Sequence, residues 1–108
     1  MAKYERTLKG DFDRTLEYLE DGIMKASLSA SYEDGSDYTV GDVRCAVRVF
    51  ERYSWTGENR VSMNVTFFQE NGGPVQLCAI TSGGSQALFF KMNTFGEEAF
   101  LDTLREIL

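Results

Sequence analysis

The chain has no histidine, so the side chain best suited to proton transfer near neutral pH is missing. A Ser-His or Cys-His nucleophilic pair cannot be assembled without it. Carboxylates could still act as acids or bases, but the 17 acidic residues fall mostly on expected helix surfaces and turns. Their ordinary role there is solubility. We therefore expect a protein that is not an enzyme and has no catalytic residue.

Cysteine is also scarce. The two cysteines, Cys45 and Cys78, are too far apart in sequence to form a closely spaced metal or redox motif. The alternation around them predicts that they lie on opposite faces of a sheet, which would prevent a disulfide because their β-carbons would point apart. We expect no metal site and no cofactor.

Long apolar runs and an excess of basic residues are missing too. No stretch approaches the roughly 18 apolar residues of a membrane span, and residues 1–8 carry charges where a signal peptide needs an apolar run. Acidic residues outnumber the 11 basic ones and give a net charge of −6, which disfavours contact with phosphate backbones. We expect a cytoplasmic protein that binds neither membrane nor nucleic acid.

The residues that are present suit one domain over residues 1–108, because 43% are hydrophobic and 13% aromatic. Apolar residues from Phe12 to Ile23, after a capping Asp11, predict an amphipathic helix. A capping-box pattern at residues 94–97 predicts a second helix at the C-terminal end. Period-two alternation predicts strands near residues 3–8, 27–32, 43–52, 61–68, 75–82 and 88–92.

The expected fold class is α+β, with five or six strands and two helices in the order βαββββ(β)α. Successive hairpins make the sheet antiparallel, and two helices with one apolar stripe each can cover only one of its faces. Asp34-Gly35 is expected to form the first hairpin turn. This two-layer sandwich is similar to a reduced helix-grip arrangement, a likeness that says little about function.

One face of the predicted sheet mixes apolar and polar side chains, as recognition surfaces do. Three arginines recur on this face at every fourth residue of the longest strand, where they could bind an acidic ligand or pair with carboxylates. We expect this face to form the interface of a homodimer, in a non-enzymatic interaction domain. The residues expected at that interface are Arg44, Arg48, Phe50, Phe68 and Ile80.

The alternative is a small-ligand-binding domain with a pocket between the sheet and the C-terminal helix. At this chain length, side chains more often fill such a space. The residues expected to line the pocket are Tyr53, Phe67, Phe90 and Phe100.

The segment Gly83, Gly84 and Ser85 has two interpretations. Paired glycines usually form a bulge or a turn between strands, and they can also form a nest of N–H groups that holds an anion. An enzyme acting through Ser85 or Cys78 would need a carboxylate or a lysine such as Lys91 as its general base.

Several segments carry a family resemblance. They are Ala-Lys-Tyr-Glu-Arg at residues 2–6 with Gly10-Asp11-Phe12, Arg44 to Ser54, Ile-Thr-Ser-Gly-Gly-Ser-Gln at 80–86, and Phe-Gly-Glu-Glu at 95–98. The chain resembles a family of small bacterial proteins known only as a domain of unknown function. The resemblance implies a self-contained cytoplasmic domain and assigns no activity, substrate or catalytic residue.

Overall fold

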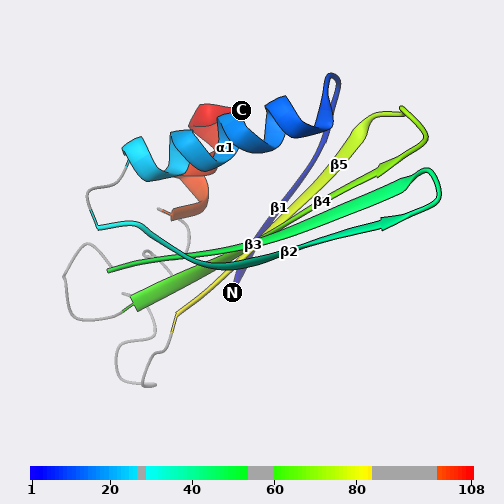
Figure 1. Cartoon of the computed structure of the whole chain (residues 1–108). Coiled ribbons are helices and arrows are strands. Elements are labelled where there is room, and N and C mark those ends of the chain that lie inside the picture. Colours follow the sequence, from blue (N-terminus) through cyan, green and yellow to red (C-terminus); the bar gives the residue numbers. More distant parts are fainter. Residues whose placement is uncertain (27–28, 54–59, 84–99) are drawn as a thin grey trace.

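The structure, a computed structural model, describes residues 1–26, 29–53, 60–83 and 100–108. These residues form an antiparallel sheet and two helices, which confirms the expected α+β class (Figure 1). The expected strand at 88–92 and the capping box at 94–97 lie outside the described residues. The elements are β1 (Ala2–Leu8), α1 (Phe12–Ala26), β2 (Ser31–Val40), β3 (Val43–Tyr53), β4 (Arg60–Glu70), β5 (Val75–Gly83) and a C-terminal helix described over residues 100–107.

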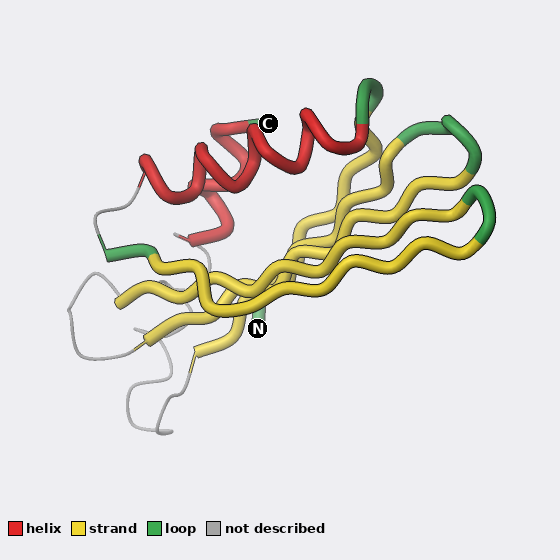
Figure 2. The backbone as a smooth tube through the Cα atoms, in the orientation of Figure 1, coloured by secondary structure: helices red, strands yellow, loops and turns green. Residues whose placement is uncertain are grey.

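The strands are arranged in the order β1-β5-β4-β3-β2, and every neighbouring pair is antiparallel. Each of the strands β2, β3 and β4 pairs with the strand that follows it in the sequence. The first strand, β1, instead pairs with β5, which is the last strand in the sequence that the structure describes. Both described helices lie on the same side of the sheet, and none of the helical residues that the structure describes lies on its other face (Figure 2). We call the two sides of the sheet the covered face and the open face.

The core lies between the covered face and the helices. Asp11 caps α1, because its Oδ2 accepts a hydrogen bond of 2.9 Å from the backbone N–H of Arg14. Phe12 then packs edge-on against Phe67 of β4, with 6.1 Å between ring centroids. The apolar face of α1 is the one that the spacing predicts. Its buried residues are Phe12, Leu16, Leu19 and Ile23.

The first hairpin turn lies at residues 41–42, so its expected position at Asp34-Gly35 was wrong. Strand β2 continues through Asp34 and Gly35 after a bulge that begins at Tyr32. Gly41 has a φ of 57°, which suits the first central residue of a two-residue hairpin loop. A β-carbon at Gly35 would lie 2.9 Å from Cδ of Arg48, so this glycine permits a close approach of the arginine.

Among the described residues, no helix is long and apolar enough to cross a membrane.

Candidate functional site

The three arginines of β3 lie on the covered face, which corrects their expected place on the open one. Arg48 and Arg52 stand opposite Val65 and Val61, which are buried beneath the helices. Phe50, expected at a dimer interface, is 0% exposed and belongs to the core. Alternation divides a strand into two faces but does not say which one the helices cover. The long apolar stem of an arginine allows it to lie against apolar neighbours on such a face.

Arg44 pairs with the start of α1. Its guanidinium donates hydrogen bonds of 3.0 and 2.8 Å to the two carboxylate oxygens of Asp13 and lies 4.3 Å from the ring centroid of Phe12. The hydrogen bond from Arg44 lowers the pKa of Asp13. Both side chains are well exposed, so the pair adds little stability.

Arg48 joins three elements. Its Nη2 donates to both carboxylate oxygens of Asp37 on β2, at 3.0 and 3.2 Å, and its Nε donates to Glu20 of α1 at 3.3 Å. Burial acts to lower the pKa of Arg48, but the hydrogen bonds and charges of Asp37 and Glu20 outweigh it and raise the pKa. The side chain is only 11% exposed. Arg44 and Arg48 therefore pair with carboxylates of their own chain.

Arg52 differs from the other two. Its Nη1 donates a long hydrogen bond of 3.4 Å to the hydroxyl of Thr103, and its guanidinium lies 4.7 Å from the ring centroid of Phe100. Its Nε is buried and has no hydrogen-bond partner among the described residues. Burial lowers the pKa of Arg52, and no carboxylate in the described ranges forms an ion pair with it. This cation lacks a compensating charge within the part of the chain that the structure describes.

The middle of the open face contains no charged side chain. The strand register places three residues from each of β5, β4 and β3 side by side in three rows across the sheet. Phe68 is 43% exposed and Ile80 40% exposed, so two large apolar side chains meet solvent here. We call this set the central patch. Its members are Gln76, Phe68 and Cys45 in the first row, Cys78, Thr66 and Val47 in the second, and Ile80, Asn64 and Val49 in the third.

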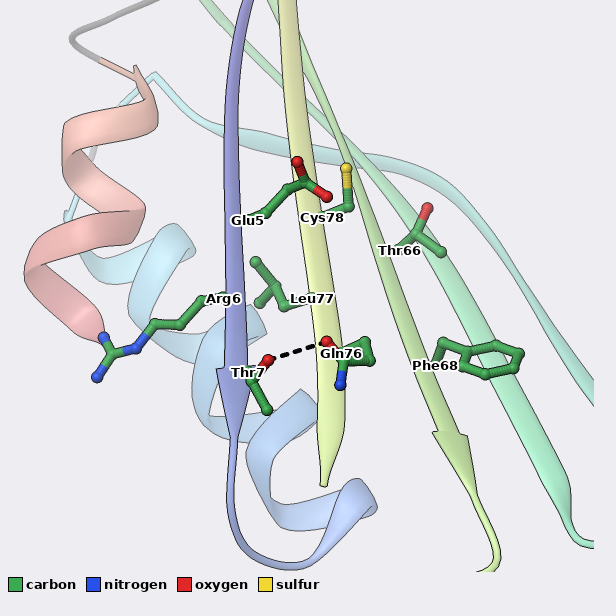
Figure 3. A pocket seen from close by; sticks show the side chains of 8 residues that line it. All are labelled: Glu5, Arg6, Thr7, Thr66, Phe68, Gln76, Leu77 and Cys78. Atoms are coloured by element: carbon green, nitrogen blue, oxygen red, sulfur yellow. Dashed lines mark hydrogen bonds between the residues drawn. The ribbon is translucent and has the colours of Figure 1, made fainter. Parts of the chain in front are cut away.

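A depression of about 310 Å³ lies beside Phe68. Gln76 is one of its lining residues, and the hydroxyl of Thr7 donates a hydrogen bond of 2.9 Å to the side-chain carbonyl of Gln76 (Figure 3). This bond joins the edge strand β1 to its neighbour β5. The lining residues are Glu5, Arg6, Thr7, Thr66, Phe68, Gln76, Leu77 and Cys78.

The two cysteines share the open face, so their expected placement on opposite faces was wrong. Cys45 stands opposite Phe68 of β4, and Cys78 stands opposite Thr66 of the same strand. Strand β4 runs between them, so their strands are roughly 10 Å apart. That distance exceeds the span of a disulfide, and both thiols are free.

The residues expected to line a ligand pocket differ in burial where the structure describes them. Phe67 and Phe100 are 0% exposed in the core, whereas Tyr53, at the end of β3, is 52% exposed. The third expected phenylalanine, Phe90, lies outside the described residues. The depression beside Phe68 is on the opposite side of the sheet from the expected pocket.

The glycine segment is described only in part. Gly83 is the last residue of β5 and pairs with Val61 of β4, as a residue of a regular strand does. Gly84 and Ser85 lie outside the described residues, as does Lys91. Cys78 has a carboxylate neighbour, because Glu5 is its cross-strand partner. A carboxylate is one of the two groups that an enzyme acting through Cys78 would need as its general base, whereas reactive cysteines usually sit beside cationic groups.

Sequence reasoning missed Glu5 and Thr7 as members of a site. These two residues come to lie beside Gln76 and Cys78 only because β1 pairs with β5, about 70 residues later in the chain. Alternation within each strand did carry a signal, since it places Gln76 on the same side as Cys78 and Ile80. The pairing of the two strands had no local signal.

Comparisons with known proteins agree with the resemblance stated above. Neither a curated protein nor a solved structure matches the chain. A family model described as a family of unknown function, DUF6054, matches residues 1–108. The chain therefore belongs to this family of unknown function.

Proposed function

We propose that this chain is a non-enzymatic interaction domain that forms a homodimer through the open face of its sheet. The observation that carries the proposal is the central patch, which has no charged residue although charged residues make up 26% of the chain. Interface cores are depleted of charge and enriched in aromatic and other apolar side chains. Phe68 and Ile80 provide such side chains at the surface.

The edges of the sheet are poor alternatives to its face. Edge strands invite pairing with another chain unless charges or bulges oppose it. On β2, the bulge after Tyr32 falls beside Glu33 and Asp34, and Asp37 follows. On β1, Lys3 and its neighbours Glu5 and Arg6 are charged and exposed. Both edges are therefore protected, whereas the open face is not.

The area of the open face is sufficient for a stable dimer. Five strands at about 4.8 Å spacing, with about eight paired residues at 3.3 Å each, give a footprint of roughly 600 Å² per chain. Two such faces bury roughly 1,200 Å², which is the lower end of the range for specific interfaces.

Charge favours a second copy over a strongly charged partner. Two chains that each carry a net charge of −6 repel one another across most of their surfaces. The central patch is uncharged, so copies can meet there without placing like charges together in the middle of the interface. Like charges at the rim are screened by solvent and salt.

Sedimentation equilibrium from nanomolar to millimolar concentration tests the proposal. The expected result is a species with twice the mass of the chain, which Phe68→Asp converts to a folded monomer. Tyr18→Asp is the matched control, because Tyr18 is 61% exposed on α1 and lies on the other layer. This control should leave the dimer intact. A native chain that stays monomeric at the highest concentration would refute the proposal.

A second candidate function, binding of a small anion beside the C-terminal helix, is supported by Arg52. A guanidinium whose Nε is buried and that has no counter-charge in the described ranges is costly, and a bound carboxylate or phosphate would compensate for it. Arg52, Val61 and Gly83 occupy one row across the end of the sheet, so the glycine segment begins at the same end. This candidate is a form of the ligand-binding alternative in which the ligand is a small anion.

Thermal unfolding in sulfate or phosphate, against chloride at equal ionic strength, tests this second candidate. Because a ligand that binds only the folded state stabilises it, sulfate or phosphate should raise the Tm of the native chain. Arg52→Gln should abolish the increase, and Arg48→Gln should retain it because Arg48 already has carboxylate partners. Equal Tm values in both salts would remove the candidate.

A further inference from the structure

We infer that Phe68 of one copy inserts into the depression beside Phe68 of the second copy, and that the exchange is reciprocal. The inference rests on the proposed homodimer and names how its two open faces fit together. The partner is a second copy of this chain, because the protruding side chain and the depression both belong to the same face.

The register of β4 and β5 makes the face self-complementary. Phe68 and Gln76 are cross-strand partners, and Gln76 lines the depression. A twofold axis parallel to the strands and midway between β4 and β5 exchanges the positions of these two strands. It therefore places each Phe68 above Gln76 of the other chain, where the depression lies.

The depression suits an aromatic side chain. Its volume is about 310 Å³, and its lining combines apolar, hydroxyl and amide groups with the charged residues Glu5 and Arg6 of β1. The hydrogen bond between Thr7 and Gln76 holds this part of the lining in place before any partner arrives, which reduces the entropy lost on binding. Phe68 is 43% exposed and would lose that exposure on insertion.

The same axis produces an interface of adequate size. Strands β4 and β5 face each other across the dimer, and β3 faces β1 of the second copy. Four of the five strands then overlap, which buries roughly 1,000 Å² in total, about the minimum for a specific interface. The exposed side chains of Lys3 and Glu5 on β1 can lie at the rim of this arrangement.

A complementary pair of variants tests the inference. Phe68→Ala removes the inserted side chain, and Cys78→Trp fills the depression. Phe68→Ala should weaken self-association by about thirtyfold, the loss typical of a central aromatic. Cys78→Trp should abolish self-association while the folded monomer keeps its secondary structure and unfolds cooperatively. Gln76→Trp fills the same depression and replaces Cys78→Trp if that variant does not fold.

The two variants mixed together provide the discriminating result. The mixture should form a heterodimer, seen by native mass spectrometry, because the Phe68 of Cys78→Trp still finds an open depression in Phe68→Ala. A native dimer whose folded filling variant, Cys78→Trp or its replacement Gln76→Trp, self-associates normally would overturn the insertion and leave the proposed homodimer standing. A native chain that never dimerises would refute both.

Discussion

Phe67 and Phe68 are neighbours in the sequence and lie on opposite faces of the sheet. Phe67 is fully buried between the sheet and α1, whereas Phe68 is 43% exposed in the middle of the open face. Chemically identical side chains therefore have different roles that depend only on the parity of their positions along β4. The covered face provides the stability of the domain, and we assign recognition to the open face.

The largest expected effect separates these two phenylalanines. Phe67→Ala should lower the free energy of unfolding by about 3–5 kcal/mol, because it removes a buried ring and leaves a cavity. Phe68→Ala should change the stability of the monomer by about 0.5 kcal/mol or less. Urea denaturation at a concentration below self-association measures both. Similar losses for the two variants would show that the open face is also part of the core.

A middle-sized effect concerns the contact between the two helices. A β-carbon at Gly22 of α1 would lie 2.8 Å from Cδ1 and 2.9 Å from Cγ2 of Ile107. Gly22→Ala should therefore lower the free energy of unfolding by about 1 kcal/mol, because overpacking outweighs the gain in helix propensity. Adding Ile107→Ala should make the Gly22→Ala change neutral or favourable. A single Gly22→Ala variant that is more stable than the native chain would contradict this close approach.

The smallest expected effect concerns Arg44 and Asp13 at the edge of the covered face. Arg44 lowers the pKa of Asp13, so the pair stabilises the fold above the ordinary pKa of aspartate, about 3.9. This stabilisation is lost as the pH falls through the lowered pKa, and it amounts to less than about 1 kcal/mol because both side chains are exposed.

Urea denaturation of the native chain and of Asp13→Asn, from neutral pH down to about pH 2, measures the contribution of this pair. The difference in stability should shrink as the pH falls. A difference that stays constant would show that Asp13 contributes through something other than its charge.

The sequence predicted the class of the fold because its local signals agreed with the final structure. The apolar spacing of α1, its Asp11 cap and the alternation in β3 to β5 each specify an element without help from distant residues. The Asp34-Gly35 signal failed because a later glycine, Gly41, forms the turn and Gly35 instead makes room for Arg48.

The choice of covered face could not be read from alternation alone. On β3 the set with more apolar members, Val43, Cys45, Val47 and Val49, lies on the open face, and the set with three arginines lies under the helices. Carboxylates on α1 and β2 compensate for two of these arginines, and their proximity to β3 arises only in the folded chain. The depression beside Phe68 also depends on a long-range contact, because the pairing of β1 with β5 forms it.

The most direct test of the open face as an interface uses its own cysteines. Cys45 and Cys78 both lie in the central patch, so a dimer formed there should hide them together. We predict that the alkylation rates of both thiols fall over the concentration range in which the mass doubles, and that Phe68→Asp keeps both rates constant. Alkylation rates that stay unchanged while the mass doubles would show that the chains associate through another surface.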